Sequence, residues 1–423
     1  MSDPQASPHG SRIDPFVDAY AARAAGMVAS EVRALFAVAS RPEVVSLAGG
    51  MPNVGALPLG ELAELVAELV RADGARALQY GSAQGDERLR EHICEVMALE
   101  GIGAGAGDVV VTVGSQQALD LLTRVFVDPG DVVVCEGPTY VTALNTFAAY
   151  QAQVVQVPMD GDGLVPEALE EALGRLASAG RRVKFLYTVP TFHNPAGVTL
   201  SAERRARVLE VCDRFGVLVV EDNPYGLLGF DAEPMRALRA DSAGGVVYLG
   251  SFSKTIAPGF RVGWALAPPA VRDKLVLAAE SAMLSHSSFN QLVVGRYLAI
   301  QPWRRQIKEF TEMYRQRRDA LLESLEAWMP AGASWTRPGG GFFVWLTLPE
   351  GLDAKTMLPR AVAERVAYVP GSGFFADGSG RGNIRLSYCY PPPELIREGV
   401  RRLAGVIDAE SGLRGAFTRP RTT

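Results

Sequence analysis

Lys254 lies in the segment Ser251-Phe252-Ser253-Lys254, directly after a short apolar run that ends at Leu249. A lysine amine at the end of a strand can form a Schiff base with an aldehyde. Ser251 and Ser253 precede the lysine and Arg261 follows it, and hydroxyl and guanidinium groups are suitable ligands for a phosphate. The chain has only five lysines, so few side chains compete for this role. Taken alone, a surface lysine in a Ser-rich loop explains the segment equally well, and the other motifs must decide.

A second motif, Glu221-Asp222-Asn223-Pro224-Tyr225, follows the apolar run at residues 217–220. An Asp at the end of a buried strand needs a partner, because an unpaired buried charge is costly. The protonated nitrogen of a pyridine ring would supply that partner, and Asp222 would keep the ring able to accept electrons. The alternative is an Asp that caps a helix or a turn, which is common before Asn-Pro.

Three further polar residues lie close to apolar runs. Asn194, within Thr191–Gly197, could donate to a phenolate oxygen of a cofactor, although Asn-Pro-x-Gly is also an ordinary turn sequence. Within Thr112–Gln117, Gly114 precedes a predicted helix, and the first N–H groups of that helix would attract a phosphate. The alternative is that Ser115 only caps the helix. Tyr140 could place its ring face on an aromatic cofactor, or it could be a core tyrosine.

Arg385 lies within the apolar pattern of residues 384–387, near the C-terminus. A partly buried Arg requires an anion, and the α-carboxylate of an amino acid fits a guanidinium group through two hydrogen bonds. A structural salt bridge is the alternative interpretation.

Apolar runs alternate with amphipathic segments through the middle of the chain. Strands are predicted at residues 109–113, 132–135, 154–157, 185–189, 217–220 and 246–249, with helices at 115–127, 166–178 and 201–215. This alternation predicts a mostly parallel sheet covered on both faces, in which ligands bind at the carboxyl ends of the strands. Further helices are predicted at 27–40, 61–71 and 87–99, and a helical region at 268–327 is predicted to break near Pro302. Strands at 342–346 and 384–387 predict a later, smaller unit.

Composition is that of an ordinary globular protein: 423 residues, 48% of them hydrophobic and 21% charged. The formal net charge of −5 and the lack of a basic run argue against a nucleic-acid partner.

The four cysteines and four histidines show no spacing typical of a metal site or a disulfide set. The polar N-terminus is unlike a signal peptide and no apolar stretch could span a membrane, so we expect no membrane partner and a cytoplasmic location.

From about residue 28 to residue 408 the chain resembles the fold-type I PLP-dependent aminotransferases of class I/II, and within them the 2-aminoadipate/kynurenine aminotransferase group. The segments that carry the resemblance are Ala29–Arg33, Ser46–Pro52, Leu78–Tyr80, Gly114–Asp120 and Tyr248–Lys254. The resemblance implies an α/β fold whose large domain has a mostly parallel seven-stranded sheet, joined to a smaller α+β domain. It implies a flexible leader at 1–25, an N-terminal segment of the small domain at 26–55, a large PLP-binding domain at 56–305 and a C-terminal small domain at 306–423.

The resemblance also implies residue roles. Lys254 would bind pyridoxal 5′-phosphate (PLP) covalently and move the substrate proton, and Asp222 would pair with the pyridine nitrogen. The other residues expected around the cofactor are Asn194 and Tyr225 at the ring oxygen, Tyr140 on the ring face, and Ser115, Gln116, Ser251, Ser253 and Arg261 at the phosphate. Tyr80 would reach the phosphate of the neighbouring subunit in a homodimer. The residues expected at the substrate are Arg385 and Asn194 at its carboxylate, Gly50 beside the pocket and Arg33 near its side chain.

The implied reaction moves an amino group from an L-amino acid to a 2-oxo acid, with 2-oxoglutarate as the expected acceptor. Expected donors are 2-aminoadipate, aromatic or non-proteinogenic amino acids. Amino-acid oxidases, decarboxylases and β-lyases share the scaffold and remain alternatives. A PLP-sensing regulator domain is disfavoured, because only about 27 residues precede the first matching helix. One departure from the family pattern is His193 before Asn-Pro-Ala-Gly, which we interpret as a side chain that packs beside Asn194.

Overall fold

The computed structural model describes residues 14, 16–27, 41–231 and 233–418. Residues 28–40 lie outside this description, and with them Arg33 and most of the helix predicted at 27–40. No helix among the described residues is long and apolar enough to cross a membrane. The same residues contain no group of three His, Cys, Asp or Glu side chains that could hold a metal ion.

The central sheet has the strand order β2-β9-β8-β7-β6-β3-β4-β5. Its predicted strands are β2 (Val109–Thr112), β3 (Val132–Gly137), β4 (Gln153–Asp160), β6 (Val183–Thr188), β7 (Leu218–Asp222) and β8 (Val246–Ser251). The strands from β8 to β4 pair in parallel, whereas β9 (Gly263–Leu266) is antiparallel to both β2 and β8. The predicted α/β fold with a mostly parallel sheet is confirmed, and the two-residue strand β5 (Gly163–Leu164) adds an eighth member.

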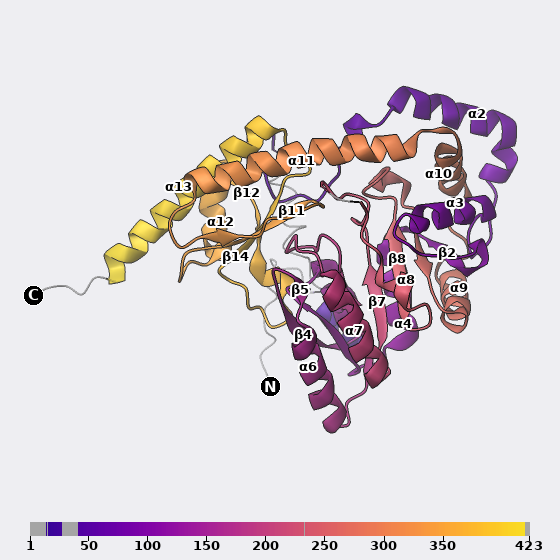
Figure 1. Cartoon of the computed structure of the whole chain (residues 1–423), viewed down its shortest axis with the longest axis horizontal. Helices are drawn as coiled ribbons and strands as arrows, with labels where there is room; N and C mark the ends of the chain where they lie inside the picture. The colour runs from indigo at the N-terminus through magenta and orange to yellow at the C-terminus, as the bar shows by residue number, and fades with distance from the viewer. Residues whose placement is uncertain (1–13, 15, 28–40, 232, 419–423) are drawn as a thin grey trace, which may run out of the picture.

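Helices cover both faces of this sheet (Figure 1). One face packs against α4 (Gly114–Phe126), α5 (Val141–Ala149) and α9 (Pro269–Met283), and the other packs against α6 (Pro166–Ser178) and α7 (Ala202–Phe215). Successive residues of β3 therefore pack into different hydrophobic clusters. Val133 and Cys135 face one side of the sheet, and Val132 and Val134 face the other. Burial on both faces explains why these strands are continuous apolar runs.

A further cluster lies beside β2 and β9, where α2 (Leu59–Ala77), α3 (Glu87–Ala98) and α10 (Ser288–Ile300) pack together. The helical region predicted at 268–327 breaks near Pro302 as expected, but it also breaks at residues 284–287. Leu284 has a positive φ of 63° there, and the Ser287 hydroxyl caps α10 by accepting from the N–H of Asn290. The region therefore forms three helices, α9, α10 and α11 (Trp303–Trp328).

The C-terminal unit is a four-stranded antiparallel sheet flanked by helices. Its strand order is β10 (Ser334–Trp335), β11 (Phe343–Thr347), β14 (Asn383–Ser387) and β13 (Val369–Pro370), and its helices are α12 (Ala354–Ala363) and α13 (Pro393–Thr418). Near the N-terminus, β1 (Val45–Ser46) pairs in parallel with β12 (Val366–Ala367), which places residues 45–46 in this unit. The helix α11 runs from the large unit to α13 (Figure 1), and the boundary that we propose after residue 305 falls in its first turn.

Candidate active site

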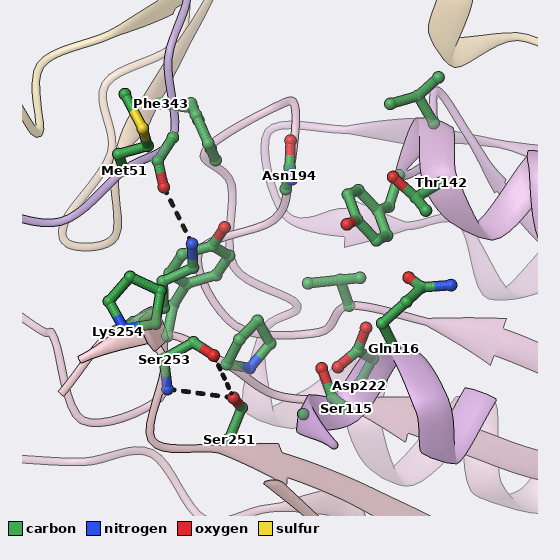
Figure 2. A pocket seen from close by; sticks show the side chains of 18 of the residues that line it. Met51, Ser115, Gln116, Thr142, Asn194, Asp222, Ser251, Ser253, Lys254 and Phe343 are labelled. Atoms are coloured by element: carbon green, nitrogen blue, oxygen red, sulfur yellow. Dashed lines mark hydrogen bonds between the residues drawn. The ribbon is translucent and has the colours of Figure 1, made fainter. Parts of the chain in front are cut away.

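A cavity of about 370 Å³ opens where the carboxyl ends of the parallel strands meet the C-terminal unit. Of the predicted site residues that the structure describes, all except Tyr80 line it: Gly50, Ser115, Gln116, Tyr140, Asn194, Asp222, Tyr225, Ser251, Ser253, Lys254, Arg261 and Arg385. Figure 2 shows Lys254 directed toward the Met51 side of this cavity, with Ser115 and Asp222 on the opposite side.

Lys254 follows the carboxyl end of β8, and its Nζ atom donates a hydrogen bond to the Gly50 carbonyl oxygen at 2.9 Å. Burial lowers the pKa of Lys254 to about 8, and the charges of Arg385 and Arg261 act in the same direction. A substantial fraction of this amine is therefore neutral near physiological pH, which is the state that can attack an aldehyde.

This lowered pKa predicts how the cofactor-free protein reacts with PLP. The rate at which Lys254 captures the aldehyde should rise with pH as the amine loses its proton, with a midpoint near pH 8. Stopped-flow absorbance of PLP mixed with the cofactor-free protein, from about pH 6 to about pH 11.5, measures this midpoint. Free Nα-acetyl-lysine is the control and should show a midpoint near the ordinary value of 10.5. A protein midpoint equal to that of the control would show that the amine is not enclosed.

Asp222 is the last residue of β7, and its side chain is buried. Its Oδ2 atom accepts a hydrogen bond from the Tyr187 hydroxyl at 2.8 Å, whereas Oδ1 has no hydrogen-bond partner among the described residues. Burial raises the pKa of Asp222 to about 6, against the opposing effects of the hydrogen bond from Tyr187 and of the nearby Ser115 hydroxyl. An unpaired buried acceptor is costly, so this oxygen fits a protonated ring nitrogen placed in the cavity.

A cradle of polar groups lies at the start of α4. The Ser251 and Ser253 hydroxyls are 2.8 Å apart (Figure 2), and Arg261 donates from Nη2 to the Val113 carbonyl oxygen at 3.0 Å. Gly114 has a φ of 73°, and a Cβ atom there would lie 2.7 Å from Arg261 Nη2, so only glycine leaves room for this guanidinium group. Two hydroxyls, a cation and a helix N-terminus together suit a phosphate.

Gln116 contributes to the cavity wall in a different way from the hydroxyl groups. Its Nε2 atom donates to Thr146 Oγ1 in α5 at 2.8 Å, and its Oε1 atom has no partner in the part of the chain that the structure describes. The side chain thus joins α4 to α5, and its role at the phosphate stays a prediction.

Arg385 lies in β14, buried and stacked over the Phe343 ring with 4.2 Å between its Cζ atom and the ring centroid. It donates to Asn194 Oδ1 at 3.0 Å and to the Ala48 carbonyl oxygen at 2.8 Å, while Nε has no partner within the described ranges. Burial lowers the pKa of Arg385 to about 10, so the guanidinium group stays charged at neutral pH. A buried cation held only by neutral oxygens suits a carboxylate ligand.

The aromatic residues enclose the space between these groups. Tyr225 is buried and packs edge-on against the rings of Phe342 and Phe343, with centroid distances of 5.4 and 6.0 Å. Tyr140 directly precedes α5 and also lines the cavity. A Cβ atom on Gly50 would lie 3.0 Å from Phe343 Cζ, so the backbone that accepts from Lys254 lies close against this ring.

Two described residues, Tyr80 and His193, do not line the cavity. The Tyr80 side chain is 77% exposed and lines no part of the cavity, and Arg33 is outside the described residues. His193 is buried, with Nδ1 accepting from the Ala196 N–H at 3.2 Å and Nε2 3.1 Å from Glu136 Oε2. These contacts hold the His193 ring between Ala196 and Glu136, and its packing beside Asn194 stays a prediction.

Several lining residues carried no chemical signal in the sequence: Met51, Val141, Thr142, Val189, Pro224, Pro258 and Phe343. Tyr187, the hydrogen-bond donor to Asp222, was also missed. The sequence did contain a signal for this contact, because a tyrosine in a buried strand needs a hydrogen-bond partner for its hydroxyl group. Tyr187 lies on β6, directly beside β7, with Val220 opposite it in the register.

The residues present fit PLP. The free Asp222 oxygen suits its ring nitrogen, the cradle of Ser251, Ser253 and Arg261 suits its phosphate, and the Lys254 amine suits its aldehyde. The sequence of residues 42–403 matches the family model for aminotransferase class I and II. The chain belongs to the class I and II aminotransferases. PLP is the cofactor of this family.

Relatives of this aminotransferase match it over nearly the whole chain. Aromatic-amino-acid aminotransferase 1 from Thermococcus litoralis is 45% identical over 393 residues, which cover 92% of this chain and 94% of that protein. A crystal structure of Pyrococcus horikoshii kynurenine aminotransferase with PMP is 43% identical with a TM-score of 0.88, covering 92% of this chain and 97% of that one. The alpha-aminoadipate aminotransferase of Thermus thermophilus, complexed with N-(5′-phosphopyridoxyl)-L-leucine, is 37% identical with a TM-score of 0.88, covering 94% and 99%. These relatives favour transamination over the lyase, decarboxylase, oxidase and regulator alternatives.

Proposed function

We propose that this aminotransferase takes L-amino acids with apolar, mainly aromatic side chains as donors and uses 2-oxoglutarate as the acceptor. The observation that carries the proposal is that Met51, Val141 and Phe343 contribute apolar side chains to the lining of the cavity that contains Arg385. Among the described lining residues, the charged groups Asp222, Lys254, Arg261 and Arg385 are all assigned to the cofactor or to the α-carboxylate. None of them is left for a side-chain carboxylate, so the second carboxylate of 2-oxoglutarate requires a cation outside the described lining residues.

The chain's own groups perform the transfer as follows. Arg385 and Asn194 hold the substrate carboxylate, which fixes the Cα–H bond relative to the Lys254 amine. Lys254 removes the Cα proton as a general base, which its lowered pKa favours. PLP, when bound, supplies the ring that accepts the electron pair, and Asp222 keeps the ring nitrogen protonated. We assign the second carboxylate of 2-oxoglutarate to Arg33.

A donor and acceptor panel tests this assignment. With 2-oxoglutarate as acceptor, kcat/KM for phenylalanine and tyrosine should exceed that for 2-aminoadipate by about tenfold or more. Arg33→Ala should raise the KM for 2-oxoglutarate about tenfold and leave the KM for phenylpyruvate nearly unchanged. The opposite ranking of donors would contradict the proposed substrate class, although transamination itself would stand.

We also propose that the working unit is a homodimer in which Tyr80 completes the partner's phosphate cradle. Leu78 and Tyr80 are 76% and 77% exposed, and Leu284 at the end of α9 is also exposed. These segments are neighbours, since a Cβ atom on Gly81 would lie 2.7 Å from Ser288 Oγ. Apolar residues gathered in this way are typical of a surface that another subunit covers.

A pair of substitutions checks the dimer. Leu78→Asp should convert the dimer to a monomer in size-exclusion chromatography with light scattering, because it places a charge in an apolar interface. Tyr80→Phe should leave the dimer intact and weaken PLP binding several-fold, because it removes one hydrogen bond to the phosphate. A wild-type protein that is monomeric at micromolar concentration and fully active would refute both assignments.

A further inference from the structure

Polar side chains are buried behind the cavity, on the side of β7 and β8 opposite to Asp222. Glu100, just after α3, is only 2% exposed. Its Oε2 atom accepts from the Tyr248 hydroxyl at 2.6 Å, and its Oε1 atom accepts from Asn223 Nδ2 at 2.6 Å. Tyr248 lies opposite Glu221 in the strand register, so these groups share one face of the sheet.

Asn223 connects this buried cluster to the cofactor site. It follows Asp222 directly, and its backbone N–H continues the sheet by donating to the Leu249 carbonyl oxygen at 2.9 Å. Its side chain points away from the cavity because successive residues of a strand face opposite sides. The hydrogen bond to Glu100 therefore holds the first residue of the turn that leads from Asp222 to Tyr225.

The turn is tightly packed against Glu100. A Cβ atom on Gly226 would lie 1.9 Å from Glu100 Oε1 and 2.7 Å from Asn223 Nδ2, so the carboxylate lies directly against the backbone of the turn. Tyr225, the residue before it, accepts at its carbonyl oxygen from the Leu228 N–H at 2.8 Å. A displacement of Glu100 or Asn223 would therefore be transmitted to Tyr225.

Burial of the Glu100 carboxylate costs desolvation free energy. Burial and the neighbouring Glu221 raise its pKa to about 7, against the hydrogen bonds from Tyr248 and Asn223 and the charge of Arg205. Glu221 has its own donors, the N–H groups of Leu238 and Arg239, so it does not depend on Glu100. An apolar side chain in place of Glu100 would avoid this desolvation cost, which indicates that the carboxyl group serves a purpose beyond packing.

We propose that Glu100 is a positioning residue for the cofactor, which acts through Asn223 to hold Asp222 and Tyr225 in place. The proposal rests on the assignment of Asp222 and Tyr225 to PLP. It predicts that substitutions of Glu100 and Asn223 have coupled effects on the Kd for PLP. Neither of these residues lines the cavity.

The test measures the Kd for PLP by absorbance titration of the cofactor-free protein, together with the Tm of that protein. Glu100→Ala should raise the Kd about tenfold, because it removes a charge-assisted hydrogen bond from the turn. In an Asn223→Ala background the same substitution should change the Kd less than about twofold, because residues that act as one unit are not additive. Glu100→Gln keeps an acceptor oxygen and should stay within about threefold of wild type.

Three further variants complete the test. Asn223→Asp places a second carboxylate against Glu100 and should weaken PLP binding, and adding Glu100→Gln should restore it by removing the repulsion. Tyr368→Phe is the matched control, because it removes a buried hydroxyl that donates to the Ala354 carbonyl oxygen in the C-terminal unit and should leave the Kd unchanged. Additive effects on the Kd, no rescue of Asn223→Asp, or a lowered Tm with an unchanged Kd would overturn the proposal. Failure of the wild-type protein to bind PLP would refute the cofactor assignment instead.

Discussion

Lys254→Ala is expected to abolish amino transfer and the covalent attachment of PLP. Lys254 is the lysine that lines the cavity, with its Nζ atom held at 2.9 Å from the Gly50 carbonyl oxygen. The substitution removes both the amine that captures the aldehyde and the base that moves the Cα proton, so kcat/KM should fall by at least about 10³-fold. Steady-state assays and mass spectrometry after borohydride reduction measure the two losses.

Lys274→Ala is the control for that experiment. Lys274 is exposed on α9, away from the cavity, and its replacement should leave activity and cofactor attachment within about twofold of wild type. Transfer that persists in Lys254→Ala, or attachment of PLP to another lysine in the wild-type protein, would be incompatible with the assigned site.

Asp222→Asn is expected to lower kcat by about 10²-fold or more at saturating PLP and donor. Asparagine has nearly the same shape, but it cannot supply the negative charge that keeps the ring nitrogen protonated, and loss of one partner of a buried charge pair costs about 3 kcal/mol or more. Tyr187→Phe removes only the neutral hydrogen bond to Oδ2 and should cost about tenfold or less. Equal activity of Asp222→Asn and wild type would show that Oδ1 faces no cation.

Much of the large unit could be predicted because its strands are buried on both faces. Runs such as Val132–Cys135 have no polar alternation, so they are recognised as strands of a covered parallel sheet. The strand β9 was missed because Gly263–Leu266 is short and follows directly on the Arg261 motif. The break at 284–287 was missed because its cause, the positive φ of Leu284, depends on the packing of α9 and α10 rather than on a proline.

The polar part of the candidate site could be predicted for a different reason. The carboxyl ends of parallel strands meet at one edge, so Ser115, Asp222 and Lys254 converge although they are far apart in sequence. The apolar wall of Met51, Val141 and Phe343 could not be predicted, because an apolar residue in the core and one in a pocket have the same sequence signal. Glu100 was missed because its partners, Asn223 and Tyr248, lie more than 100 positions away.

The stoichiometry of a single half-reaction tests the central claim most directly. The PLP-loaded protein is mixed with a donor such as phenylalanine without any acceptor, and the 2-oxo acid, ammonia and peroxide are measured. One 2-oxo acid per active site is expected, followed by no further turnover, with neither ammonia nor peroxide released. Adding 2-oxoglutarate should restart turnover and form one glutamate for each 2-oxo acid. Continued release of ammonia or peroxide without an acceptor would contradict the assignment as an aminotransferase.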